Sequence, residues 1–371
     1  MNIILVFTFG ISLKSWKESG LLEREIYLYE QISSKHNIKY TFITYGDESD
    51  SYIVQNENIK VIPIYKFIKK SESQYLNLLK SFMFTRKIKN ELKNIDIIKT
   101  NQLNGSWVGL ILKFILKKPL ITRTGYNLYE FSLQEKKNIF TRSFHYHLTK
   151  LSLKYSDIYT VSSFADKKFL NERFNSDSEI QIVPNWIRQL NSESFENRYS
   201  KKILAVGRLE NQKNFESLIK DLSKTKIEID IVGDGSKKDE LVILAKELDV
   251  DVNFLGKLSY EDLEKLYRKY RVLVNSSNFE GNSKVILEAM ANGCSVVARK
   301  NKNNIEIIED KINGFTYTDA NELVDILNKL MNDADVFNNI TENAYESIKK
   351  NNLIETTISK EINNYESLIN F

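Results

Sequence analysis

The chain has 371 residues, of which 42% are hydrophobic and 27% charged, with a net charge of +4 and a single cysteine. This length allows two domains, and the balance of apolar and charged residues is that of a folded globular protein rather than a disordered one. The lone Cys294 excludes an intrachain disulfide and a zinc ribbon, and it indicates a reducing, cytoplasmic compartment.

The positive charge is concentrated in the first half of the chain. Residues 1–190 hold 28 basic and 18 acidic side chains, whereas residues 191–371 hold 25 and 31. An anionic membrane surface, a phosphorylated acceptor or nucleic acid would each suit such a surface, and so would a lysine-rich solvated surface with no partner. No nucleic-acid motif accompanies the basic residues, so we expect no nucleic acid and predict peripheral contact with the inner face of the plasma membrane.

Short apolar strands alternate with helical segments from the first residue onward. Met1–Gly10 is apolar but lacks the basic start and the cleavage site of a signal peptide, so we expect a buried strand there. A helix is predicted for Glu23–Ser33, and another for Tyr75–Leu92, where apolar residues recur at helical spacing. The apolar run Trp107–Leu112 is far shorter than the roughly 18 residues that a bilayer span needs, so no transmembrane segment is expected.

This alternation predicts two doubly wound α/β domains with Rossmann-like parallel sheets, residues 1–188 and 202–345. Residues 189–201 are polar and aperiodic and are interpreted as the linker, while 346–371 are expected to form a helix that packs back on the N-terminal domain. The predicted strands lie near Ile3–Phe7, Lys39–Tyr45, Ile59–Pro63, Asp96–Thr100, Pro119–Arg123, Ile158–Ser162, Glu179–Val183, Ile203–Gly207, Ile227–Gly233, Asn253–Leu255, Arg271–Asn275, Ser295–Ala298 and Phe315–Tyr317.

The first motif of the second half follows the strand that ends at Gly207. Arg208 and Lys213 lie in the loop after it, just before a helix. Because ligands of open α/β sheets bind at the carboxyl ends of the strands, two cations at this place suit a diphosphate. Taken singly, each is more simply explained as ordinary surface charge.

The second motif, residues 280–291, places Glu280 before and Glu288 inside an apolar helix. The loop residues Gly281, Asn282 and Ser283 can direct backbone N–H groups, and the partial positive charge of the helix, toward an anion. The carboxylates would repel a phosphate, so they are better suited to hold hydroxyl groups. The pattern indicates a sugar joined to a nucleotide, although either acid alone is more simply a solvated residue.

Together these segments, with Ile231-Val232-Gly233-Asp234-Gly235 and Phe254-Leu255-Gly256, resemble the retaining GT-B glycosyltransferases of the large bacterial group 1, family 4-like family. The resemblance covers nearly all of the chain. It implies that the second domain binds a nucleotide-diphosphate sugar and the first an acceptor, with transfer between them that needs no metal or other cofactor.

The resemblance also implies a role for each site residue. Arg208, Lys213 and Glu280 would be catalytic, the cations on the diphosphate and Glu280 facing the transferred sugar, and Glu288 would bind the ribose. The remaining donor-binding residues would be Gly281, Asn282, Ser283, Lys284 and Val285 near the phosphate and sugar, Gly256, Lys257 and Leu258 beside the base, and Gly20 in the first loop.

Two departures from the family pattern concern the first half. Gly20 is a single glycine where the family often has two, and no histidine follows the strand that ends at Arg123. We expect Arg123 or Tyr126 to take over acceptor or phosphate contacts.

The expected activity is hexosyl transfer to a glycan, a lipid-linked or a protein-linked acceptor in the assembly of bacterial surface polysaccharide such as lipopolysaccharide or capsule. A sugar epimerase or phosphorylase of the same fold, and a non-catalytic sugar-nucleotide-binding subunit of a transferase complex, are the alternatives.

Overall fold

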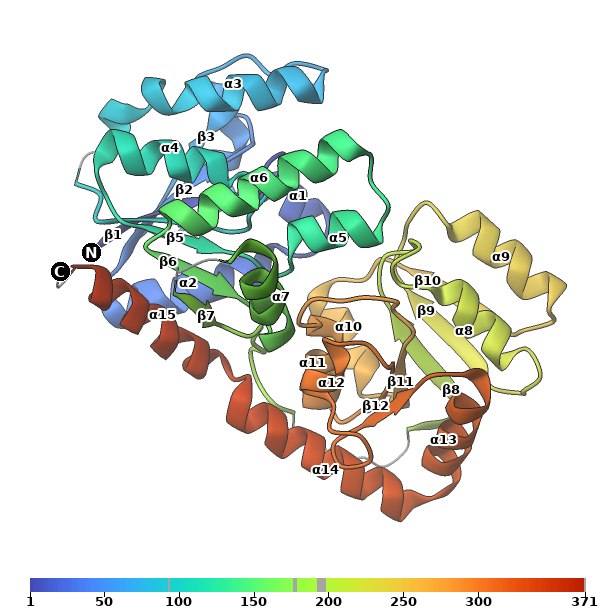
Figure 1. The fold of residues 1–371 in the computed structure, drawn as a ribbon. Coiled ribbons are helices and arrows are strands. Elements are labelled where there is room, and N and C mark those ends of the chain that lie inside the picture. The colour runs from blue at the N-terminus through green and yellow to red at the C-terminus, as the bar shows by residue number, and fades with distance from the viewer. Residues whose placement is uncertain (93, 176–178, 192–197, 370–371) are drawn as a thin grey trace. The chain divides into compact units, whose positions relative to one another are not determined.

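The computed structural model describes residues 1–92, 94–175, 179–191 and 198–369 (Figure 1). The chain divides into two compact units. Unit 1 contains Met1–Val183 and the C-terminal residues from Ile358 onward, and unit 2 contains Pro184–Thr357.

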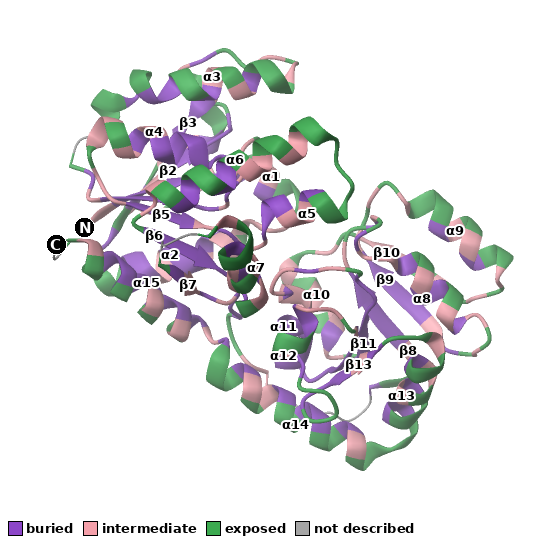
Figure 2. Ribbon diagram, viewed as in Figure 1, coloured by how far each residue is buried: buried purple, intermediate pink, exposed green. Residues whose placement is uncertain are grey.

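The described part of unit 1 is built on one parallel sheet with the strand order β3-β2-β1-β4-β5-β6-β7. Ile3, Ile4 and Leu5 in its centre have no exposed surface, which is typical of a parallel sheet covered by helices on both faces (Figure 2). The strands are β1 (Asn2–Val6), β2 (Lys39–Thr44), β3 (Ile59–Pro63), β4 (Ile97–Thr100), β5 (Leu120–Arg123), β6 (Ile158–Val161) and β7 (Ile180–Ile182).

Helices connect these strands, and several begin at side-chain caps. Asn127, Asn138 and Ser163 each accept a hydrogen bond from a backbone N–H of the first helical turn, which satisfies groups that a helix start leaves unpaired. The helices are α1 (Leu13–Glu18), α2 (Leu22–His36), α3 (Gln74–Lys87), α4 (Ser106–Leu116), α5 (Leu128–Gln134), α6 (Ile139–Tyr155) and α7 (Phe164–Phe174), with short 3₁₀ turns at Glu48–Tyr52, Ile64–Lys66 and Lys89–Glu91.

The described part of unit 2 also has a parallel sheet, with the order β10-β9-β8-β11-β12-β13. Its strands are β8 (Tyr199–Val206), β9 (Glu228–Val232), β10 (Val252–Gly256), β11 (Tyr270–Asn275), β12 (Ser295–Arg299) and β13 (Phe315–Tyr317). Its helices are α8 (Phe215–Leu222), α9 (Lys238–Glu247), α10 (Tyr260–Tyr267), α11 (Lys284–Ala291), α12 (Asn304–Ile307), α13 (Ala320–Asn332) and α14 (Ala334–Asn351).

The two predicted doubly wound α/β domains are confirmed, and each predicted strand has a counterpart. The division after Val183 comes earlier than the expected end of the first domain at residue 188. Of the expected linker 189–201, residues 192–197 lie outside the described residues, and Tyr199–Lys201 belong to β8. This start of β8 is fixed by distant residues, because the Tyr199 N–H donates to the Lys269 carbonyl at 2.8 Å and its ring packs on Tyr270.

The chain returns to unit 1 through α15 (Ile354–Ile369), which follows α14 after a break at Asn352 and Leu353. In unit 1, α15 places Glu361 and Tyr365 against the sheet. The Glu361 carboxylate pairs with the Lys99 ammonium of β4 at 2.5 Å, and the Tyr365 hydroxyl lies 3.3 Å from that of Tyr40. None of the helices in the described ranges combines the length and apolar character that crossing a bilayer requires.

Candidate functional site

The candidate site lies in unit 2, where β8, β9, β10 and β11 end. These strands are neighbours and run parallel, so their carboxyl ends meet at one edge of the sheet. This edge is the usual ligand-binding position of an open α/β sheet. The two motifs predicted from the sequence follow β8 and β11, which are adjacent strands, and the fold therefore brings them together.

Glycines shape the end of β8. A Cβ atom at Gly207 would lie 2.9 Å from Cδ of Lys213, so the absence of a side chain lets the lysine lie across the strand end. Gly233, at the end of β9, has φ of +141°, and a Cβ there would lie 1.9 Å from the Gly207 carbonyl oxygen. The absence of a side chain at Gly233 therefore permits this close approach between the ends of β8 and β9.

Lys213 and Glu280 form the central ion pair of the site. The ammonium contacts the carboxylate directly, and their side chains are only 13% and 7% exposed. Glu280 also accepts hydrogen bonds from the Ser277 hydroxyl at 2.7 Å and from the Asn275 amide at 3.5 Å. Its carboxylate is therefore held in one orientation by groups from both loops, as a residue that positions a ligand requires.

Further hydrogen bonds join the two loops. The Gln212 amide donates to the Phe279 carbonyl at 3.1 Å, and the Asn278 N–H donates to the Gln212 carbonyl at 3.0 Å. Gln212 also accepts from the Arg208 guanidinium at 3.3 Å. Arg208 itself is exposed, so its charge is accessible to an anion beside the Lys213–Glu280 pair.

The loop before α11 is fixed from another direction. Asn282 accepts a hydrogen bond from the Asn185 N–H at 2.9 Å through its side chain, and another from the Asn185 amide at 2.5 Å through its carbonyl. Ser283 is the N-cap residue of α11, and the Lys284 ammonium lies 5.9 Å from the centre of the Trp186 ring. The predicted residues Gly281, Asn282, Ser283, Lys284 and Val285 are thus at the start of this helix.

Glu288 occupies a more interior position. Its side chain is 3% exposed, and it accepts a hydrogen bond from the Tyr267 hydroxyl at 3.3 Å. It lies in α11, about one helical turn beyond Lys284.

The residues predicted beside the base are at the end of β10. Gly256 has φ of +71° with open space where a Cβ would be, and its carbonyl accepts from the Gly233 N–H at 2.8 Å. Lys257 pairs with Asp234 at 3.6 Å, and Leu258 is half-buried. They belong to the same sheet edge, two strands away from β8.

The predicted residues of the first half lie in unit 1. Gly20 has φ of +70° in the turn between α1 and α2. Arg123 ends β5 and donates from its guanidinium to the Asn101 carbonyl at 3.1 Å, while the Tyr126 ring packs on Phe131 with centroids 4.7 Å apart. Arg123 and Tyr126 are therefore at the carboxyl edge of the unit 1 sheet.

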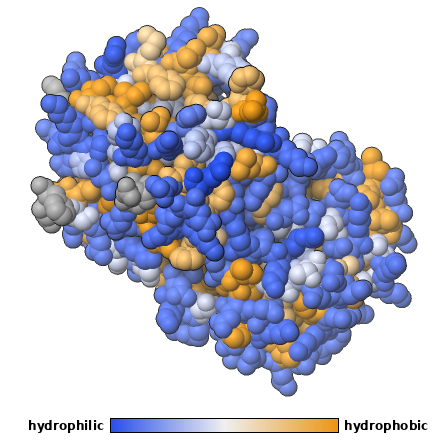
Figure 3. All heavy atoms as spheres, viewed as in Figure 1, coloured by the Kyte–Doolittle hydropathy of each residue, from blue (hydrophilic) through white to orange (hydrophobic). Residues whose placement is uncertain are grey.

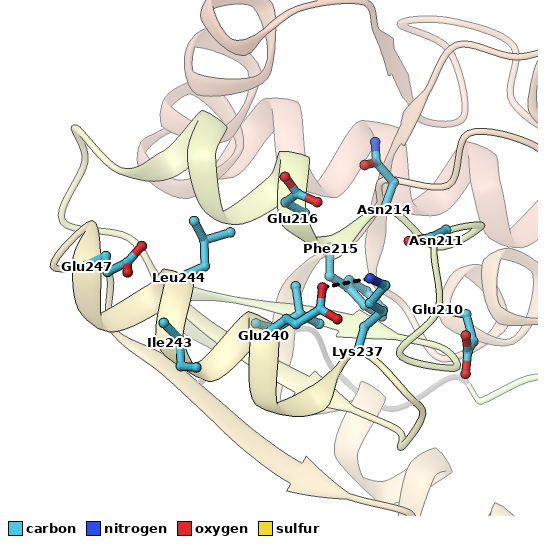
Figure 4. A pocket seen from close by; sticks show the side chains of 11 residues that line it. Glu210, Asn211, Asn214, Phe215, Glu216, Lys237, Glu240, Ile243, Leu244 and Glu247 are labelled. Carbon is cyan, nitrogen blue, oxygen red and sulfur yellow. Dashed lines mark hydrogen bonds and ion pairs between the residues drawn. The ribbon is translucent and has the colours of Figure 1, made fainter.

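A hollow of about 310 Å³ lies beside α8 and α9 in unit 2 (Figure 4). Its floor is apolar, and its rim carries Glu210, Glu216, Glu240 and Glu247. Lys237, on the same rim, pairs with Glu240 at 2.6 Å. The excess of carboxylates would repel a diphosphate, so this hollow does not suit the predicted donor as well as the strand edge does.

Sequence reasoning missed the residues that hold the site together. Asn275 and Ser277 orient Glu280, Gln212 joins the loops, and Asn185 fixes Asn282. A signal was present for two of them, since Asn275 is the polar last residue of the largely apolar strand β11 and Ser277 follows it closely. The partners Gln212 and Asn185 are identified only by the fold.

The model of the glycosyl transferases group 1 family matches residues 188–347. The amylovoran biosynthesis glycosyltransferase AmsD of Erwinia amylovora is 26% identical over 322 residues, 84% of each chain. The GalNAc-alpha-(1->4)-GalNAc-alpha-(1->3)-diNAcBac-PP-undecaprenol alpha-1,4-N-acetyl-D-galactosaminyltransferase of Campylobacter jejuni is 26% identical over 349 residues, 89% of this chain and 91% of the relative.

The fold is similar to that of HepE of Anabaena, solved in complex with UDP-glucose. The TM-score is 0.76 with 19% sequence identity, and the match covers 99% of this chain and 100% of HepE. This likeness and the two parallel sheets confirm the predicted GT-B fold.

Proposed function

We propose that this chain, whose residues 188–347 match the model of the group 1 family of glycosyltransferases, transfers a hexose or related sugar from a nucleotide diphosphate, with retention and without a metal, to a glycan, lipid-linked or protein-linked acceptor. The reaction would take place in the cytoplasm during assembly of a surface polysaccharide or glycoconjugate. Support for this setting comes from the relatives, one named for amylovoran biosynthesis and one for a diphospho-undecaprenol-linked glycan.

The observation that carries the proposal is the Lys213–Glu280 pair beside the exposed Arg208, at the start of α11. A diphosphate placed there would meet two cations and the positive end of a helix. The HepE structure was solved with UDP-glucose, so UDP-sugars are the first donors to examine.

The proposed reaction breaks the bond between the anomeric carbon and the diphosphate oxygen and forms a bond to the acceptor oxygen on the same face of the sugar. Negative charge grows on the leaving diphosphate, and Arg208 and Lys213 would stabilise it. The acceptor proton would pass to the departing diphosphate, so no separate protein base is required. Glu280, paired with Lys213, would orient the sugar hydroxyls.

Binding of activated sugars tests the donor assignment. We expect one class of nucleotide sugar to raise the unfolding free energy by about 2.7 kcal/mol when it is present at about 100 times its dissociation constant. Thermal denaturation with a panel of UDP-, GDP-, ADP- and CMP-sugars measures this. Unchanged melting curves across the whole panel would contradict the proposal. With the stabilising donor and an acceptor, release of the free nucleotide diphosphate distinguishes a transferase from an epimerase.

Replacing Glu280 by glutamine separates an enzyme from a non-catalytic binding subunit. The amide keeps the size of the side chain but removes the charge that faces Lys213 and the sugar. We expect turnover to fall at least about tenfold while the donor still binds, because the lost interaction serves the transition state more than the ground state. Steady-state rates and donor titrations measure the two effects. Glu247→Gln, an exposed acid on α9, is the matched control, and equal rates for both variants would exclude the assigned role of Glu280. A parent chain that binds the donor but releases no nucleotide diphosphate in the presence of acceptor would favour the binding subunit.

A further inference from the structure

Helix α3 of unit 1 buries one large apolar side chain, Phe84, but most of its other buried side chains are polar, and several apolar side chains face outward. The buried residues include Asn77, Ser81 and Thr85. The outward residues Leu79 and Met83 are 62% and 68% exposed. An ordinary surface helix shows the opposite arrangement, so the outer side of α3 has the composition of a contact surface.

The apolar surface of α3 continues across α4 onto α6. The rings of Phe82 on α3 and Phe144 on α6 each lie 5.8 Å, centroid to centroid, from the buried Trp107 of α4. Phe140, one turn before Phe144, is 84% exposed. Figure 3 shows hydrophobic residues gathered where Figure 1 places these helices. We call this surface the α3–α6 face, formed by Tyr75, Leu79, Phe82, Met83, Phe140 and Phe144.

The helices that carry this face contain no acidic residue. They contain seven basic residues: Lys80, Arg86, Lys87, Lys113, Arg142, Lys150 and Lys154. Lys113 pairs with Asp157, whereas Lys80 and Lys87 donate to backbone carbonyls and have no carboxylate partner among the residues that the structure describes. The apolar surface therefore lies on helices whose charged side chains are all basic.

We propose that the α3–α6 face docks on an anionic lipid bilayer, with its apolar side chains in the headgroup and acyl boundary and its basic side chains on the lipid headgroups. A bilayer fits both properties at once, since it offers an apolar layer beneath a negatively charged surface. A second copy of the chain would bring together two faces of like charge. Nucleic acid would match the charge but would leave aliphatic side chains such as Leu79 and Met83 without a partner.

Vesicle sedimentation of the full chain tests the proposal without donor or acceptor, so its result is independent of the transfer reaction. We expect binding to vesicles that contain one part phosphatidylglycerol to two parts phosphatidylcholine. Binding should weaken as salt is raised, because the electrostatic attraction is screened, and it should be much weaker with phosphatidylcholine alone. Failure to sediment with the anionic vesicles at low salt would overturn the proposal.

Two variants divide the apolar from the electrostatic contribution. Leu79→Ser/Met83→Ser/Phe140→Ser removes exposed apolar groups, and Arg86→Glu/Lys150→Glu reverses exposed charges. Each should lower the partition coefficient by at least about tenfold. Ile243→Ser and Lys238→Glu, exposed residues of α9, are the matched controls and should bind as the parent chain does.

Melting curves and analytical ultracentrifugation complete the experiment. The variants should melt as the parent chain does, because the replaced side chains are on the surface. Parent-like vesicle binding by both test variants would overturn the proposal. So would a concentration-dependent dimer that the apolar variant dissolves, since the face would then be an interface between copies of the chain.

Discussion

Replacing Lys213 by methionine is expected to lower kcat/KM for sugar transfer by about 10²–10³-fold, as the loss of one preorganised group that stabilises transition-state charge typically does. Methionine retains an unbranched side chain of similar length, so the contact with Gly207 is largely kept. The ammonium that would face the departing diphosphate is lost. Initial rates at several donor concentrations, measured by nucleotide diphosphate release, give this quantity.

Two further variants show whether the effect is electrostatic. Lys213→Arg keeps the charge and should retain part of the activity, although the planar guanidinium cannot reproduce the ammonium geometry. Lys220→Met removes an exposed lysine of α8 that pairs with Glu216, and it should transfer at the parent rate. Because Lys213→Met leaves the buried Glu280 without its cation, melting curves must accompany the rates. Parent-like kcat/KM in folded Lys213→Met would exclude the assigned role.

The strands were predictable because their signal is local. Runs such as Ile3–Phe7 and Arg271–Asn275 are apolar and bounded by polar residues, and both appear in the sheets. The limits of β8 were not predictable from the sequence, because the first residues of this strand are polar and pair with residues far along the chain. The predicted helix at Tyr75–Leu92 ends at Lys87, and only part of its apolar spacing faces the core, because Phe84 is buried whereas Leu79 and Met83 face outward. Periodicity locates an apolar stripe but does not tell which side of the helix the core occupies.

The candidate site was predictable where chain order alone decides position. Residues that follow neighbouring parallel strands meet at one sheet edge, so Arg208, Lys213 and Glu280 could be grouped from the sequence. The contacts that support these residues could not be predicted, because the hydrogen bond between Asn185 and Asn282, for example, joins residues 97 positions apart. Glu288 illustrates a second limit. The sequence shows an acid on a helix, whereas its burial against Tyr267 depends on the packing of α10 and α11.

The ion pair between Lys99 and Glu361 was also invisible in the sequence. Lys99 lies in the middle of a strand and Glu361 in the last helix, and their side chains are 1% and 3% exposed. Lys99 also donates to the Tyr365 hydroxyl at 3.2 Å, across 266 residues of chain. Burial lowers the pKa of Lys99, while the charge and hydrogen bond of Glu361 act in the opposite direction. The C-terminal helix is thus joined to the unit 1 sheet by a charge pair that water does not reach.

Replacing Glu361 by glutamine is expected to lower the unfolding free energy of unit 1 by about 3–5 kcal/mol, the usual cost of leaving one buried charge without its partner. Urea unfolding followed by tryptophan fluorescence measures this loss. In a Trp186→Phe background the remaining tryptophans are Trp16 and Trp107, which both belong to unit 1 and are 6% and 4% exposed. The signal then reports this unit alone. A loss below about 1 kcal/mol would show that the pair does not hold a buried charge.

Two further measurements distinguish the loss of a charge partner from the loss of packing. They are the stability of the double variant Lys99→Met/Glu361→Leu and the pH dependence of the stability of Glu361→Gln. The double variant removes both charges. Its unfolding free energy should lie within about 1 kcal/mol of the parent value or exceed it, as is often found when hydrophobic residues replace a buried pair.

In Glu361→Gln the pKa of Lys99 should fall further, because the charge and hydrogen bond of Glu361 that raise this pKa are gone. The unfolded chain then binds more protons than the folded one between that lowered pKa and the ordinary lysine value of about 10.4, so the stability of the variant should rise as pH increases through this window. A packing defect alone would give the same loss at every pH, and it would persist in the double variant.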